Sequence, residues 1–188
     1  MENKMLQNIV KEESAIVLDY LEHGYPLEKI GMKNPIVQAL GTGHLTLLEL
    51  IPKKDIFLQP HQKIYIGEGK RDDIHHIKGK IPYDKLTITA KKELQHVVKE
   101  VVELNQSKFI AFFNKAQPLS MRMHQLELLP GLGKKHMWEI IKIRRFKPFE
   151  SFDDLKERVK LLPNPKQVIV KRIMLELKGN EKYKLFVG

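Results

Sequence analysis

The sequence predicts an α+β fold of two domains, a small OB-like β-barrel followed by an all-α domain. In the first half, short apolar runs alternate with glycine, proline and aspartate, whereas the second half places apolar residues at helical spacing. The net charge differs between the halves as well. Residues 1–88 hold 12 Lys/Arg and 12 Asp/Glu, whereas residues 89–188 hold 21 Lys/Arg and 11 Asp/Glu, so the whole excess of positive charge lies in the second half. We therefore expect a barrel at 1–88, linking helices at 89–118 and a helical domain at 119–188.

Composition narrows the class of protein further. With 42% hydrophobic and 30% charged residues, the 188-residue chain is typical of a soluble globular protein. It has no cysteine, which excludes disulfides, thiol catalysis and cysteine-ligated metal sites, and favours a cytoplasmic location. Apolar runs are too short to span a membrane, and the charged residues 1–14 are unlike a signal peptide. The basic second half predicts a polyanionic partner.

Five short runs predict the strands of the barrel. They are Ser14–Leu21, Pro35–Gly41, His44–Ile51, Gln62–Gly69 and Asp73–Ile81. The stretch "EGKRDD" at 68–73 predicts a hairpin tip joining the last two strands. Candidate nucleic-acid contacts of the barrel are Lys70, Arg71, Lys78 and Lys80. His75 and His76, adjacent in a strand, should point to opposite faces, which argues against a shared metal site.

Helices follow in the second half. Apolar spacing predicts helices at Thr89–Leu104 and Ser107–Ala116, and Ser107 is expected to cap the second helix. We expect the phenylalanines of the second helix to be buried rather than exposed for base stacking. From Leu119 onward the helices come in two pairs. Met123 and Leu126 mark the first helix, and Met137 and Ile140 the second. Ser151 caps the third, and the fourth runs from Asn164-Pro165 to Gly179.

An internal repeat connects the two pairs. "LLPGLGK" begins at Leu128 and "LLPNPK" begins at Leu161, 33 residues later, each between two apolar-periodic segments. Two helix-turn-helix units of this length can bury their apolar faces against each other.

The first turn of this repeat predicts an anion site. Pro130 ends the preceding helix, and Gly131 and Gly133 permit a tight turn without covering the backbone. The amides of Leu132, Gly133 and Lys134 are then unpaired N–H groups at the positive end of a helix. Lys134 and Lys135 add full charges, so a chain of phosphates is the expected ligand.

The second turn is a weaker candidate, because Asn164 tolerates left-handed geometry but Pro165 has no N–H to donate. Supporting charge is expected from Lys166, Lys171 and Arg172. A basic cluster between the two pairs is expected both to stabilise a helix C-terminus and to follow a nucleic-acid backbone. It consists of Lys142, Arg144, Arg145 and Lys147.

"LELLPGLGKK" resembles the hairpin of the helix-hairpin-helix superfamily, whose tandem domains bind DNA or RNA backbones. Together with "PIVQALGTGHLTLLELIPK" and "FFNKAQPL", it also resembles an archaeal family of uncharacterised, predicted RNA-binding proteins that join an OB-like barrel to a tandem helix-hairpin-helix domain. The resemblance implies a two-domain fold and a link to RNA or translation. We expect a non-catalytic nucleic-acid-binding protein, with RNA favoured over DNA on that resemblance, and ribosomal or transcription proteins as further partners. No cofactor and no metal are expected.

Two alternatives remain. The first is a protein-interaction scaffold in a ribosomal or transcription assembly. The second is a DNA-processing enzyme, since DNA glycosylases with this hairpin place a lysine and an aspartate at a spacing similar to that of Lys134 or Lys135 and Asp153 or Asp154. "ESFDDLKERV" is nevertheless more typical of a capped helix start, so we expect no enzyme activity.

Overall fold

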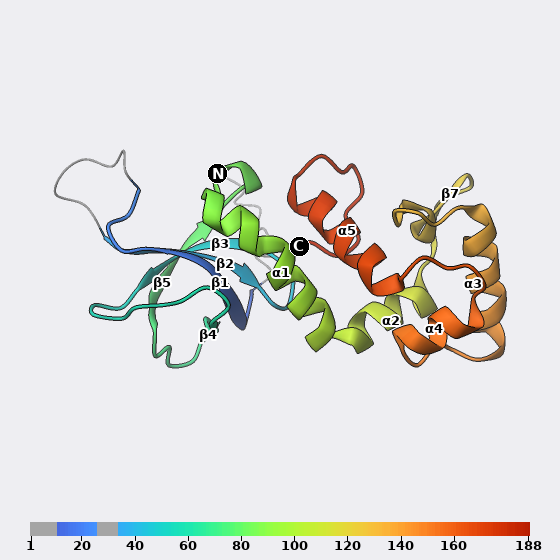
Figure 1. Ribbon diagram of the computed structural model, residues 1–188, viewed down its shortest axis with the longest axis horizontal. Helices are drawn as coiled ribbons and strands as arrows, with labels where there is room; N and C mark the ends of the chain where they lie inside the picture. Colours follow the sequence, from blue (N-terminus) through green and yellow to red (C-terminus); the bar gives the residue numbers. More distant parts are fainter. Residues whose placement is uncertain (1–10, 26–33) are drawn as a thin grey trace, which may run out of the picture. The chain divides into compact units, whose positions relative to one another are not determined.

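A computed structural model describes residues 11–25 and 34–188 (Figure 1). The chain forms two compact units, which we treat separately: unit 1 runs to Val97 and includes Phe186–Gly188, and unit 2 is Val98–Leu185. A five-stranded antiparallel sheet and five α-helices confirm the α+β class. Residues 1–10, part of the stretch judged unlike a signal peptide, lie outside the described residues.

Unit 1 contains all five predicted strands. They are β1 (Ser14–Leu21), β2 (Ile36–Gly41), β3 (Leu47–Pro52), β4 (Lys63–Tyr65) and β5 (Ile74–Lys80). The order in the sheet is β4-β1-β2-β3-β5, so the predicted hairpin between β4 and β5 is wrong. β4 pairs with β1 at one edge of the sheet, and β5 pairs with β3 at the other edge. The segment that joins them spans the inner face of the sheet, because Ile64, Ile66 and Ile74 all belong to the one apolar core there.

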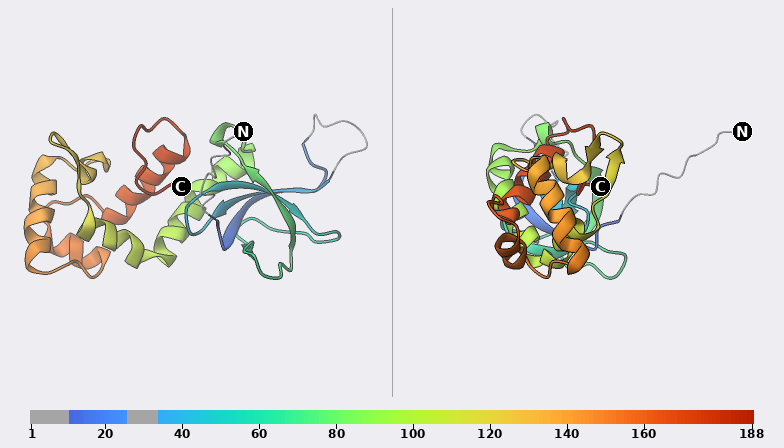
Figure 2. Two further views of the ribbon diagram at one scale, coloured as in Figure 1. Left: turned by 180° about the vertical axis from the view of Figure 1, so that it is seen from behind. Right: turned by 90° about the vertical axis from the view of Figure 1, so that its right-hand side faces the viewer.

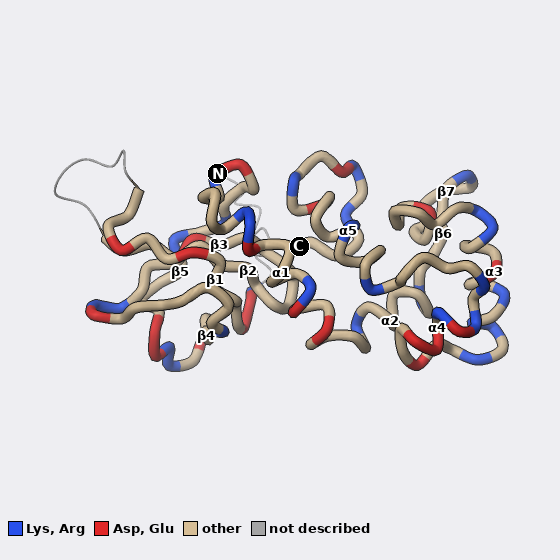
Figure 3. The backbone as a smooth tube through the Cα atoms, viewed as in Figure 1, with Lys and Arg blue, Asp and Glu red and all other residues tan. Residues whose placement is uncertain are grey.

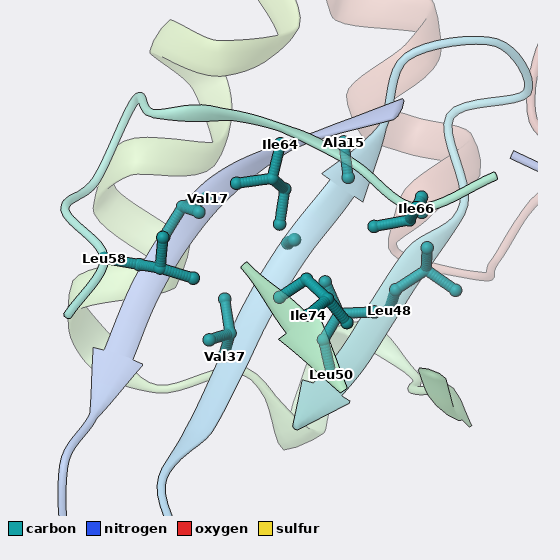
Figure 4. Close-up of a cluster of buried hydrophobic side chains, with 10 residues drawn as sticks. Ala15, Val17, Val37, Leu48, Leu50, Leu58, Ile64, Ile66 and Ile74 are labelled. Atoms are coloured by element: carbon teal, nitrogen blue, oxygen red, sulfur yellow. The ribbon is translucent and has the colours of Figure 1, made fainter. Parts of the chain in front are cut away.

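The sheet curls around this core (Figure 2). Side chains from the strands, together with Leu58, converge on the inside of the curl (Figure 4). Within the described residues the edge strands β4 and β5 do not pair with each other, so the sheet is a curled half-barrel and not a closed barrel.

The outer face of the sheet is buried as well. Helix α1 (Ile88–Leu104) begins there, because the side chain of Gln38 accepts a hydrogen bond from the Thr87 N–H (2.9 Å) and the Thr87 hydroxyl donates to Asp19 (2.6 Å). Ile16, Leu18, Ile36 and Leu40 are at most 2% exposed, although they alternate with the inner core residues. Burial on both faces explains why these strands read as nearly continuous apolar runs.

Unit 2 is mainly helical. It contains α2 (Gln106–Lys115), α3 (Lys134–Phe146), α4 (Phe152–Arg158) and α5 (Pro165–Leu177). Phe109, Ile110 and Phe113 of α2 are buried, as the sequence indicated, whereas Phe112, which was also expected to be buried, is half-buried. The cap position of α2 is Asn105, so the prediction that Ser107 caps this helix is wrong.

The first helix of the first predicted pair is absent from unit 2, all of which the structure describes. In its place lie the short strands β6 (Pro118–Ser120) and β7 (Met123–His124) and the 3-10 turn η2 (Gln125–Leu128). The His124 ring accepts a hydrogen bond from the Leu126 N–H (3.1 Å), and the Glu127 carboxylate accepts one from the His124 N–H (2.8 Å). This capping box starts a single tight turn, which Pro130 prevents from continuing as a helix.

The second predicted pair is present. The Ser151 hydroxyl accepts a hydrogen bond from the Asp154 N–H (3.0 Å) and caps α4, and the Asn164 side chain accepts one from the Gln167 N–H (3.2 Å) and caps α5. Gly179, at φ +82°, follows the end of α5. No helix within the described ranges has both the length and the apolar character needed to cross a bilayer.

Candidate functional site

Leu129–Gly133, which we call turn 1, joins η2 to α3. Gly131 has φ +85°, a conformation that glycine adopts without strain. Pro130 and Gly131 occupy the two central positions that favour a type II turn, and the Leu132 N–H donates to the Leu129 carbonyl (3.1 Å). The prediction that the Leu132 amide is unpaired is therefore wrong. Leu132 anchors the turn instead, with its side chain buried.

The start of α3 has no side-chain cap. Gly133 occupies the cap position with φ −89° and ψ 177°, and its carbonyl accepts the Met137 N–H (3.1 Å). The amides of Lys134, Lys135 and His136 belong to the first turn, where no helical carbonyl is available to them. A Cβ placed on Gly133 would meet no described atom within 4 Å. The positive end of a 13-residue helix is thus accessible to a ligand.

Val159–Asn164, which we call turn 2, differs from turn 1 in backbone geometry. Its left-handed residue is Leu161 (φ +57°), whereas Asn164 has φ −51°. Asn164 does not use the left-handed geometry that it tolerates, because its side chain caps α5 and because Pro165 restricts the residue before it. The sequence repeat therefore does not extend to backbone conformation.

Turns 1 and 2 are held side by side. A Cβ on Gly131 would lie 3.6 Å from Cγ of Pro163. The His136 ring is hydrogen-bonded to the carbonyl of Leu161 (3.1 Å), and the Glu139 carboxylate accepts the Lys160 N–H (3.1 Å). Helix α3 therefore fixes turn 2 beside its own first turn.

Arg144 is used differently from the prediction. Its guanidinium donates to the carbonyls of Phe113 and Ala116 (both 2.8 Å) at the C-terminus of α2. Burial, and after it the charge of Arg145, lowers the pKa of Arg144. This side chain caps a helix within unit 2 and is not available to follow a backbone.

The remaining predicted cations fall into two groups. Lys134, Lys135, Lys142 and Arg145 are exposed along α3, among the Lys and Arg positions coloured in Figure 3. Lys147 is exposed beside Glu150 (2.9 Å), Lys166 pairs with Glu103 (3.1 Å), and Lys171 is exposed on α5. Arg172 was wrongly expected to attract phosphate.

Arg172 is 3% exposed and lies between two carboxylates, those of Glu176 (2.8 Å) and Glu181 (2.7 Å). It also donates to the Leu128 carbonyl (3.2 Å), just before turn 1. Arg172 is therefore a structural residue, whose charge is neutralised by two carboxylates and which fixes the backbone just before turn 1.

Sequence reasoning missed Trp138. This side chain is 63% exposed, while its neighbours Met137 and Ile140 are buried. At 3.6 residues per turn, Trp138 shares one face of α3 with Lys134 and Lys142, a helical-wheel signal that was available in the sequence.

Two open grooves meet at Trp138. Groove A, about 650 Å³, lies against β6, β7 and α3, and its lining includes Met121, Arg122, Met123, Lys134, Trp138 and Arg145. Groove B is lined by α3 and turn 2, and its residues include Lys135, Trp138, Lys142, Lys160 and Leu161. Arg122 and Lys160 thus join the predicted cations.

The candidate acids of the enzyme alternative are in helix-capping positions. The Asp154 carboxylate accepts the Glu150 N–H (3.0 Å) and pairs with Arg158 (3.0 Å). The Glu150 N–H, followed by Arg158, lowers the pKa of Asp154. Across residues 11–25 and 34–188, no three His, Asp or Glu side chains cluster as metal ligands.

In unit 1, two of the four predicted contacts of the barrel make bonds within the unit, while Lys70 and Lys80 are exposed. Lys78 pairs with Glu49 (2.5 Å), and Arg71 donates to the Gly67 carbonyl (2.8 Å). His75 and His76 do not point to opposite faces, since their Nδ1 atoms are 2.8 Å apart. A bulge causes this, because Ile51 pairs with His76 and Pro52 with Ile74, which leaves His75 as an extra residue.

The sequence and the fold of this chain are similar to those of proteins from one family. A family model described as a protein of unknown function (DUF655) matches residues 11–188. An uncharacterised protein of Methanocaldococcus jannaschii, MJ0038, is 47% identical over 178 residues, covering 94% of this chain and 80% of its own. The crystal structure of Af1531 from Archaeoglobus fulgidus is similar with a TM-score of 0.85 at 42% identity, covering 94% of this chain and all of that one.

Proposed function

We propose that this chain, which belongs to the DUF655 family of uncharacterised archaeal proteins, binds nucleic acid. The ligand is the phosphate backbone, held without regard to base sequence and without a chemical step. The start of α3 carries this proposal, because its first amides have no capping side chain while α4 and α5 in the same unit each begin with one.

The charges at this helix start point the same way. Lys134 and Lys135 are the first two residues of α3, and its first turn contains no acid. Cations at this end oppose the helix dipole and cost about 0.3–1 kcal/mol each. A bound phosphate reverses that cost, since it accepts the amide hydrogens and pairs with both lysines. A local arrangement that disfavours the free helix is typical of a functional site.

The strand order of unit 1 and the order of elements in unit 2 support a more specific proposal, in which an OB-type barrel is joined to a tandem helix-hairpin-helix domain. The order β4-β1-β2-β3-β5 places β4 and β5 where a five-stranded barrel of the OB type would close. In this proposal, η2–turn 1–α3 and α4–turn 2–α5 are the two units of a tandem helix-hairpin-helix domain whose first helix is reduced to one turn. RNA is proposed ahead of DNA on the family resemblance alone, because phosphate recognition does not distinguish them.

The test is a salt-titrated binding series with single-stranded RNA, structured RNA and duplex DNA. Lys134→Glu/Lys135→Glu is compared with Lys182→Glu/Lys184→Glu, a matched charge change at exposed positions of the same unit. If both lysines contact phosphates, the slope of log K against log salt, which is negative, should become less steep by about 1.4–1.8 in the first variant, and the control should change it far less. Equal binding by the two variants would refute the proposal.

A protein-interaction role is the second candidate, and exposed apolar side chains favour it. Leu161 is 86% exposed and Phe146 is 85% exposed, both in the part of unit 2 that carries the cations. Its signature is association with a protein that is unchanged by Lys134→Glu/Lys135→Glu and is lost when Phe146 and Leu161 become polar.

A further inference from the structure

We infer that Trp138 is a stacking platform for an unpaired base, so that the site selects single-stranded or looped nucleic acid over duplex. This inference rests on the function proposed above and names its class of ligand. It starts from an unusual exposure: the only tryptophan of the chain leaves 63% of its surface in water. Tryptophan is normally largely buried in a soluble protein.

The surroundings of Trp138 decide which ligand fits. Trp138 lines groove A together with Arg122, Lys134 and Arg145. It also lines groove B together with Lys135, Lys142 and Lys160. A flat apolar surface between two groups of cations complements a polyanion that also carries flat apolar rings, as a nucleic-acid strand does.

The acids in the two grooves do not cancel this complementarity. Glu127 in groove A accepts the His124 N–H (2.8 Å), and Glu139 in groove B accepts the Lys160 N–H (3.1 Å). Each carboxylate is therefore held by a backbone amide, and the cations outnumber the acids in both grooves.

The platform is rigid, because the rest of α3 is fixed. Met137 and Ile140 are buried under the helix, and His136 binds turn 2 through the Leu161 carbonyl (3.1 Å). Lys134 and Lys142 lie one turn before and one turn after Trp138, about 6 Å away along the axis. A strand running along α3 can thus place phosphates near these lysines and one base on the indole. Bases inside a duplex are already stacked and paired, so they cannot make this contact.

The test uses three probes: a short oligouridylate, an RNA duplex and inorganic polyphosphate, which has the charges without the bases. Because Trp138 is the single tryptophan, its fluorescence reports this position alone. Oligouridylate should quench it, whereas the RNA duplex and polyphosphate should both give far less quenching, even where they bind. Quenching of equal size by polyphosphate, or none by oligouridylate, overturns the inference.

Variants separate this inference from the proposed function. Trp138→Leu should weaken oligouridylate binding by roughly 5- to 150-fold, the range of one lost stacking contact, and leave polyphosphate binding unchanged. Trp138→Phe should retain most of the affinity. Phe146→Leu is the control, since Phe146 is exposed on the same helix but lines neither groove. If Trp138→Leu binds oligouridylate normally while Lys134→Glu/Lys135→Glu does not, stacking fails and phosphate binding stands. If wild type binds none of the probes, both fail.

Discussion

Replacing Gly133 by aspartate should raise stability and lower nucleic-acid affinity at the same time. The backbone there, φ −89° and ψ 177°, is one that any residue adopts, and the added Cβ meets no described atom within 4 Å. An aspartate at this cap position can accept the N–H of Lys135 or His136. The carboxylate then occupies the amides that the proposal assigns to phosphate.

The size of each effect follows from the same contact. A carboxylate cap exceeds glycine by a few tenths of a kcal/mol, and its charge at the positive helix end adds about 0.3–1 kcal/mol. A gain of about 1 kcal/mol raises the Tm of a chain of this length by about 2–4 °C. Losing a phosphate contact to charged groups costs about 1.5–3 kcal/mol, which weakens binding by roughly 10- to 150-fold.

Thermal melting followed by circular dichroism gives the stability, and fluorescence anisotropy of a labelled RNA at fixed salt gives the affinity. Gly133→Ala is the control, because it adds a Cβ without an acceptor or a charge, and it should keep most of the affinity. A more stable Gly133→Asp protein that binds as tightly as wild type would show that these amides are not the phosphate site.

Three further predictions concern residues that maintain the fold. Arg144→Met loses two hydrogen bonds to carbonyls of α2, so urea unfolding should show a loss of about 1–3 kcal/mol, whereas RNA affinity should change far less than in Lys134→Glu/Lys135→Glu. Glu12→Gln removes the charged acceptor of three backbone amides in the β2–β3 turn and should also cost about 1–3 kcal/mol, with unchanged RNA binding as its check. Burial, and after it the charge of Arg144, lowers the pKa of His124. Just below pH 6.5, which is about the ordinary pKa of histidine, the unfolded chain therefore binds more protons than the folded chain. The stabilisation by neutral His124 is therefore fully present only above about pH 6.5, and the Tm should fall as the pH is lowered through that value, less so in His124→Asn, which keeps an acceptor but does not titrate. An equal fall in both proteins contradicts the role of His124.

Local signals in the sequence predicted the elements that local interactions determine. Ser14–Leu21 is a strand with the predicted bounds, and Ser151 and Asn164 cap α4 and α5. Each depends on residues within a few positions, such as a hydroxyl or amide oxygen facing an N–H three residues later. The engaged amide of Leu132 was also predictable, because proline followed by glycine favours a type II turn that uses this N–H.

Other errors involve contacts between distant residues. Nothing near Arg144 in the sequence indicates that it binds carbonyls about 30 residues earlier, and nothing near β4 and β5 shows that the sheet separates them. Arg172 and Glu176 have the spacing of a helical ion pair, but only the packing of unit 2 makes that pair buried. Trp138 was overlooked because apolar periodicity assigns tryptophan to the core by default, while its helical face belongs to the lysines.

A titration of the 15N-labelled protein with inorganic polyphosphate, followed by amide NMR shifts, reports directly whether the first amides of α3 bind phosphate. If they do, the amides of Lys134, Lys135 and His136 should show large, saturable shifts, and the Gln167 amide, which the Asn164 side chain already caps, should show small ones. Shifts that are as large at the start of α5 as at the start of α3, or absent from α3, would contradict phosphate binding at these amides.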